Sequence, residues 1–251
     1  MTGPAIAVEQ IPEIGHDEAM NLAATEYDRV LGLADELVDG DWSRRTDCTD
    51  WDVKDMLGHL LGMFEQHADA DERTRQFAAA AGIAQQTGGI PLDEMTALQV
   101  REHADLSTAE LTRSLHDAAR RGLTGRRATT GEERAATFVV HLPGEQPWTF
   151  GYLFDIIYTR DPWMHRVDLS RATGRAAELS SAHDGRLVAD VVADWARRHQ
   201  RPFTLTLTGA AGGAYQSGTG GPQVTLDAVE FCRTLSGREA GDGILNTPVP
   251  F

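Results

Sequence analysis

The first two thirds of the chain carries apolar residues at intervals of three and four, the spacing of helices with one buried face. One such stretch covers residues 17–38 and stops at Gly40. A second follows Asp52, which is placed to cap it, and contains Gly58 and Gly62, where a neighbouring helix could approach closely. Its apolar face consists of Val53, Met56, Leu57, Leu60, Leu61 and Phe64.

The middle of this region gives one weak and two clear signals. Residues 78–89 are rich in Ala, Gln and Gly and predict a loop or a loosely held helix. Ser107 and Glu110 have the spacing of a capping box, which predicts a helix over about residues 108–121. A further segment opens at Trp148 and repeats the helical spacing through Phe150, Leu153, Phe154, Ile157, Leu169 and Ala172.

The pattern changes near Gly174. Residues 179–199 predict one helix, residues 202–209 a strand, and the glycine-rich residues 209–227 a hairpin or a meander. Asp227 and Glu230 then open a last helix that stops at Gly237. We therefore predict an α+β protein with an N-terminal bundle of about four helices (residues 1–174) and a smaller C-terminal α+β domain (residues 175–251).

Charge and composition narrow the class of partner. The net charge of −15 argues against nucleic acids and anionic membranes, since phosphate groups repel such a surface, and favours a small-molecule substrate. The chain has no apolar run long enough to span a membrane and no secretory signal at its start, so we expect a cytoplasmic protein. Cys48 and Cys232 form no paired-ligand motif and are expected to be small buried hydrophobes.

Residues 159–175, TRDPWMHRVDLSRATGR, place Asp161 and His165 four apart with Pro162 between them. In a continuous helix both side chains lie on one face, where they suit a divalent cation. Alternatively, Asp161 caps a helix that starts at Pro162. The residue types alone favour the cap, because a proline inside a helix costs roughly 3 kcal/mol. His59, at the edge of an apolar face, is by itself more typical of a satisfied core residue.

Three stretches carry a family resemblance: CTDWDVKDMLGHLLG, TRDPWMHRVDLSRATGR and the terminal LDAVEFCRTLSGREAGDGILNTPVPF. Together they resemble the mycothiol-dependent maleylpyruvate isomerase family of actinobacteria, within the DinB-like four-helix-bundle superfamily. The resemblance implies a divalent metal, usually zinc, held by His59, Asp161 and His165, and an active-site arginine that matches Arg238. The sequence departs from the family pattern at Asp161, where the family has Glu, and in the proline that follows.

The resemblance also implies mycothiol as a low-molecular-weight thiol cosubstrate. We expect a metal- and mycothiol-dependent enzyme that adds the thiolate to a small electrophile and releases the conjugate, as an S-transferase does. The alternatives are a cis-trans isomerase of maleylpyruvate-like acids, a metal hydrolase, and a non-catalytic binding protein of the same fold.

Overall fold

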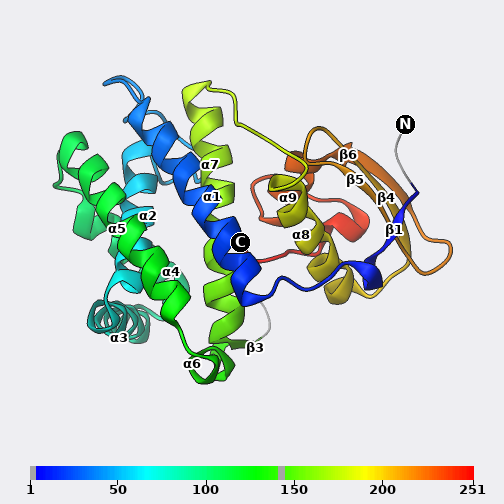
Figure 1. The fold of residues 1–251 in the computed structure, drawn as a ribbon, viewed down its shortest axis with the longest axis horizontal. Helices are drawn as coiled ribbons and strands as arrows, with labels where there is room; N and C mark the ends of the chain where they lie inside the picture. The colour runs from blue at the N-terminus through cyan, green and yellow to red at the C-terminus, as the bar shows by residue number, and fades with distance from the viewer. Residues whose placement is uncertain (1–3, 141–144) are drawn as a thin grey trace. The chain divides into compact units, whose positions relative to one another are not determined.

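The computed structural model describes residues 4–140 and 145–251, which belong to two compact units. One unit is Gly15–Ala176, and the other joins the chain up to Ile14 with Ala177–Phe251. The larger unit is built around a bundle of four helices (Figure 1), which are α1 (His16–Asp35), α2 (Val53–Ala68), α5 (Thr108–Ala128) and α7 (Tyr158–Thr173). The α+β class predicted from the sequence is confirmed.

The predicted capping residues begin two of these helices. The Asp52 side chain accepts from the Asp55 N–H, and the Asp55 carboxylate accepts from the Asp52 N–H in return. Ser107 and Glu110 make the same reciprocal pair at the start of α5. Each box satisfies two N–H groups that a helix start otherwise leaves unpaired, so these boundaries could be predicted locally.

Two further helices extend the bundle where the sequence signal was weak. They pack against α2 and against each other, and are α3 (Ala70–Thr87) and α4 (Pro91–His103). Of the two alternatives predicted for residues 78–89, the loop was wrong for most of the stretch: α3 runs through it to Thr87 and is capped by Gly88, whose φ of 73° suits glycine. The helical period of apolar residues is weak here because α3 buries mostly alanines and few large side chains, among them Gln76.

A short helix and a hairpin connect α5 to the segment before α7. They are α6 (Gly131–Ala135), β2 (Thr137–Val140) and β3 (Gln146–Thr149), and the two strands pair antiparallel. In the described ranges, none of the helices combines the length and apolar character that crossing a membrane requires.

The smaller unit is a four-stranded sheet with the order β1-β5-β4-β6 and two helices against it (Figure 1). Its elements are β1 (Ile6–Ala7), α8 (Asp184–His199), β4 (Phe203–Thr208), β5 (Gly213–Ser217), β6 (Gln223–Asp227) and α9 (Ala228–Leu235). The meander alternative was wrong for β6, which crosses over to pair parallel with β4. The predicted domain boundary also needs a correction at the N-terminus, because β1 pairs with β5 and carries the first residues into this unit.

Candidate metal centre

Asp161 does not cap a helix. A turn of π-helix (Tyr152–Ile157) runs directly into α7, and Ile157 before it has helical dihedrals of −62° and −50°. Asp161 therefore lies in the first turn of α7, and Pro162 lies inside the helix. The capping interpretation that residue types favoured is wrong, and the continuous-helix alternative describes the structure.

A buried arginine makes the internal proline tolerable. Pro162 has no N–H to donate to the carbonyl of Tyr158, four residues earlier. The Arg126 guanidinium, which is fully buried, donates to this carbonyl instead, at 2.8 Å. It also donates to the Phe154 carbonyl in the π-helical turn (2.5 Å) and to the Thr159 hydroxyl (2.7 Å). Arg126 thus supplies from α5 hydrogen bonds that α7 cannot make by itself.

Three of the predicted site residues converge within the bundle. His59 Nε2, from α2, lies 3.2 Å from Asp161 Oδ2, and His165 Nε2 lies 3.2 Å from Asp161 Oδ1. One ligand atom from each residue lies within 4.8 Å of those from the other two. A regular α7 is needed for this arrangement, because only a continuous helix brings residues 161 and 165 to one face.

The outer nitrogens of both imidazoles are also bound. His59 Nδ1 lies 2.7 Å from Gln99 Oε1 of α4, and His165 Nδ1 lies 3.2 Å from Asp168 Oδ2. Each ring is therefore held from behind by an oxygen acceptor while its Nε2 faces the Asp161 carboxylate. Metal-binding histidines in proteins are oriented in this way, by an acceptor on the nitrogen that does not bind the metal.

The cluster is also electrostatically coupled. Burial opposes the charged form of Asp161, but the facing rings of His165 and His59 outweigh it and hold the pKa of the Asp161 carboxyl well below its ordinary value. Burial likewise opposes the charged form of His165, yet Asp161 and Asp168 raise its pKa well above the ordinary value. These groups stabilise a positive charge beside Asp161, whether a proton or a metal ion carries it.

Further side chains close around the rings. The Trp51 ring centroid lies 5.1 Å from that of His59 and 5.9 Å from that of His165. The Cys48 thiol, His165 and Asp168 form a second group whose ligand atoms lie within 4.8 Å of one another. Cys232 is buried as expected, whereas half-buried Cys48 lies beside a candidate ligand.

The sequence predicted the three converging residues and missed their supports. Asp168 could have been found, because it follows His165 by three residues and so shares its helix face. Gln99 and Cys48 gave no signal, since only the fold brings them to the rings. Arg238 follows α9 in the other unit, and its predicted role remains a prediction.

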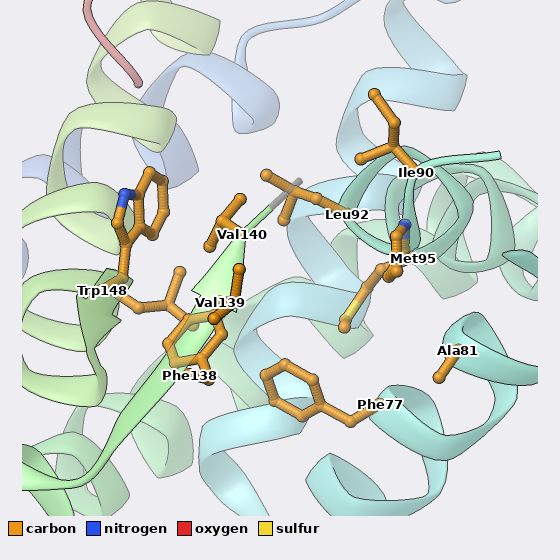
Figure 2. A pocket seen from close by; sticks show the side chains of 11 residues that line it. Phe77, Ala81, Ile90, Leu92, Met95, Phe138, Val139, Val140 and Trp148 are labelled. Atoms are coloured by element: carbon orange, nitrogen blue, oxygen red, sulfur yellow. The ribbon is translucent and has the colours of Figure 1, made fainter. Parts of the chain in front are cut away.

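A separate apolar pocket of about 120 Å³ lies in the larger unit. Figure 2 shows Phe77, Met95 and Phe138 converging on it from α3, α4 and β2. Among the described residues that line it, none carries a charge or belongs to the His59 cluster. A substrate carboxylate would find no charged partner among these described residues, so the histidine cluster is the better candidate for chemistry.

A family model and solved structures match the chain. A family model described as the mycothiol maleylpyruvate isomerase N-terminal domain matches residues 23–170. A crystal structure of the mycothiol-dependent maleylpyruvate isomerase is similar, with a TM-score of 0.60 and 13% identity, over 94% of this chain and 93% of that one. A histidine-to-alanine mutant of the mycothiol-dependent maleylpyruvate isomerase gives 0.59 and 13%, over 93% and 92%. A search of the curated proteins found no match.

Proposed function

Because the chain belongs to the mycothiol maleylpyruvate isomerase N-terminal domain family, we propose that it is a mycothiol-dependent enzyme that isomerises a small cis-unsaturated acid of the maleylpyruvate type. The sequence analysis favoured conjugation of the thiol, as in an S-transferase, and kept isomerisation as the alternative. The family and both similar crystal structures carry the isomerase description and so favour the alternative. The same family supports a thiol cosubstrate.

The observation that carries the proposal is the convergence of two imidazole Nε2 atoms and one carboxylate, each imidazole being held by a second acceptor. Two nitrogens and one oxygen are a donor set typical of catalytic zinc. The rings also fit a cation for a second reason. Both nitrogens of His59 and of His165 face oxygen acceptors, whereas a neutral imidazole carries only one N–H, so a cation beside the Nε2 atoms would take the place of the missing proton.

A divalent metal bound by His59, Asp161 and His165 would lower the pKa of a thiol and so supply a thiolate at neutral pH. The protein residues would hold this site in shape. Gln99 and Asp168 orient the two rings, and Trp51 covers them on one side. We carry Arg238 forward as the predicted partner of a substrate carboxylate, which an arginine binds through two parallel hydrogen bonds.

The isomerisation itself needs only reversible addition of the thiol. The thiolate sulfur forms a bond to one carbon of the cis double bond, and the π electron pair moves onto the conjugated carbonyl oxygen. The former double bond is then single and rotates. Return of the electron pair expels the thiolate and leaves the trans acid, so the thiol is regenerated and no other reactant is consumed.

The test combines metal content with product analysis. Zinc would be measured by mass spectrometry in the wild type and in His59→Ala and His165→Ala. His116→Ala is the control, since His116 is exposed on α5 and pairs with Asp35, away from the cluster. We expect about one zinc per chain in the wild type and the control, and loss of zinc in both site variants. Full zinc in both site variants would contradict the ligand assignment.

Product analysis then separates the two reactions. Maleylpyruvate and mycothiol would be incubated with the wild type and followed by NMR. Formation of the trans acid with the thiol unconsumed supports the isomerase, whereas a stable thioether would favour the S-transferase. Zinc without dependence on thiol would refute the proposal and favour a hydrolase.

A further inference from the structure

Three buried glutamine side chains form a continuous hydrogen-bonded chain behind His59. Gln66 of α2, Gln76 of α3 and Gln99 of α4 are 0%, 0% and 2% exposed. Gln76 Oε1 lies 2.8 Å from Gln66 Nε2 and 2.9 Å from Gln99 Nε2. Gln99 Oε1 in turn lies 2.7 Å from His59 Nδ1. Such buried amides stay in the interior only when their donors and acceptors are matched.

The far end of this chain fixes its direction. Gln76 Nε2 lies 2.8 Å from Glu72 Oε1 and 3.2 Å from the Gly62 carbonyl. Both partners can only accept a hydrogen bond. The Gly62 group is a backbone carbonyl, and Glu72 is ionised because the hydrogen bonds from Arg75 keep the pKa of its carboxyl below the ordinary value. The donating NH₂ group of Gln76 must therefore face them, and its Oε1 must face the other two glutamines.

This direction passes through Gln99 to the imidazole. Because Gln76 Oε1 accepts, Gln99 must turn its NH₂ group toward it and its Oε1 toward His59. An acceptor at 2.7 Å favours a proton on His59 Nδ1, which leaves the Nε2 lone pair facing Asp161. We propose that Gln99 is a positioning residue that keeps His59 as an Nε2 metal ligand, and that Gln76 fixes the orientation of its amide. The inference rests on the proposed metal site.

The glycine predicted to permit a close helix approach makes room for this residue. A Cβ added at Gly62 would lie 2.5 Å from Gln99 Cγ and 2.7 Å from Gln99 Cβ. Position 62 thus has to be a glycine for the Gln99 side chain to reach His59. Gly62→Ala would displace Gln99 without removing a polar group.

The test compares zinc affinity, measured by chelator competition, in variants along the chain. Gln99→Met keeps the length of the side chain but removes the acceptor, and we expect zinc binding to weaken roughly 10–100-fold. Gln99→Glu keeps an oxygen toward His59 Nδ1, and its carboxyl, when protonated, can donate to Gln76 Oε1 as the amide does. Its zinc affinity should therefore lie closer to that of the wild type than the affinity of Gln99→Met does. Gln66→Met is the matched control: it is equally buried in the same network but leaves Glu72 and Gly62 to orient Gln76, so its affinity should be unchanged.

NMR of the zinc-loaded protein provides a readout that a general loss of stability would not move. The wild type and Gln66→Met should show a slowly exchanging His59 Nδ1–H signal, assigned by its loss in His59→Gln, and Gln99→Met should lack it. Wild-type affinity in Gln99→Met, or an equal loss in Gln66→Met, would overturn the inference and leave the proposed function standing. A wild type that binds no zinc would overturn both.

Discussion

The pairing of Arg126 with the carbonyl opposite Pro162 makes a quantitative prediction for the start of α7. Arg126→Met removes the donor that the Tyr158 carbonyl receives in place of a helical N–H, and it also removes hydrogen bonds to Phe154 O, Thr159 Oγ1 and the Tyr27 hydroxyl. A buried carbonyl without a donor costs about 1–3 kcal/mol, and three lost hydrogen bonds add about 0.5–1.5 kcal/mol each. We expect unfolding in urea to show a loss of roughly 2.5–7.5 kcal/mol in the free energy of unfolding.

A double-mutant cycle isolates the proline from the rest of this loss. Pro162→Ala returns a backbone N–H at the position that faces the Tyr158 carbonyl. In the Arg126→Met background this N–H would donate to a Tyr158 carbonyl that has lost its donor, whereas in the wild type Arg126 already donates to it. Pro162→Ala should therefore be more favourable in the Arg126→Met background by about 1–3 kcal/mol. Additivity within about 0.5 kcal/mol would refute the compensation, and the general helix preference of alanine cancels because it enters both arms.

Three further predictions use single variants. Asp161→Asn keeps the shape but removes the charge that faces both Nε2 atoms, so zinc affinity should fall by at least roughly 10–100-fold; unchanged metal content would show that the carboxylate is no ligand. His67, whose pKa burial and Arg126 hold well below the ordinary value, stays neutral when folded, while the unfolded chain binds a proton below about pH 6.5. The free energy of unfolding should thus fall on acidification by up to about 1.4 kcal/mol per pH unit for this group. In urea titrations His67→Leu should lose less stability between pH 7.5 and 5.5 than the wild type does. Equal losses would exclude His67 as a source of the pH dependence. Gly122→Ala would place a Cβ 2.6 Å from the Phe64 carbonyl and should lower the thermal midpoint, with a cost of about 1–3 kcal/mol, whereas Gly32→Ala, which meets no atom within 4 Å, should raise it.

The Asp161 carboxylate constrains any residue that replaces it. A residue that replaces Asp161 must satisfy His59 and His165 together, because its two carboxylate oxygens face different rings. Glutamate has one methylene more and would have to enter the same space from α7. The shorter aspartate reaches both rings from the first turn of α7, which continues the π-helical turn without a break.

Local chemistry explains the parts of the fold that the sequence predicted. The capping boxes at Asp52 and Ser107 place donors and acceptors within three residues of each other, so their signals survive without any tertiary contact. The helical period of apolar residues likewise reports a buried face whatever packs against it. His59 and His165 could be proposed as ligands of one metal only because a family resemblance implied it. They are 106 residues apart, so their positions in the sequence do not pair them.

Tertiary structure decided those features that depend on a hydrogen bond between two distant segments of the chain. Whether Asp161 caps a helix or lies within it depends on Arg126, a residue of another helix that satisfies the carbonyl Pro162 leaves without an N–H. The orientation of His59 depends on amides from α3 and α4, and an amide carries no sequence signature of its partner. The sequence alone determined the helix starts that have capping boxes, the helices with a clear apolar period, and the residue types available for a metal. Only the fold determined which nitrogen each histidine presents, because that depends on hydrogen bonds between groups that are distant along the chain.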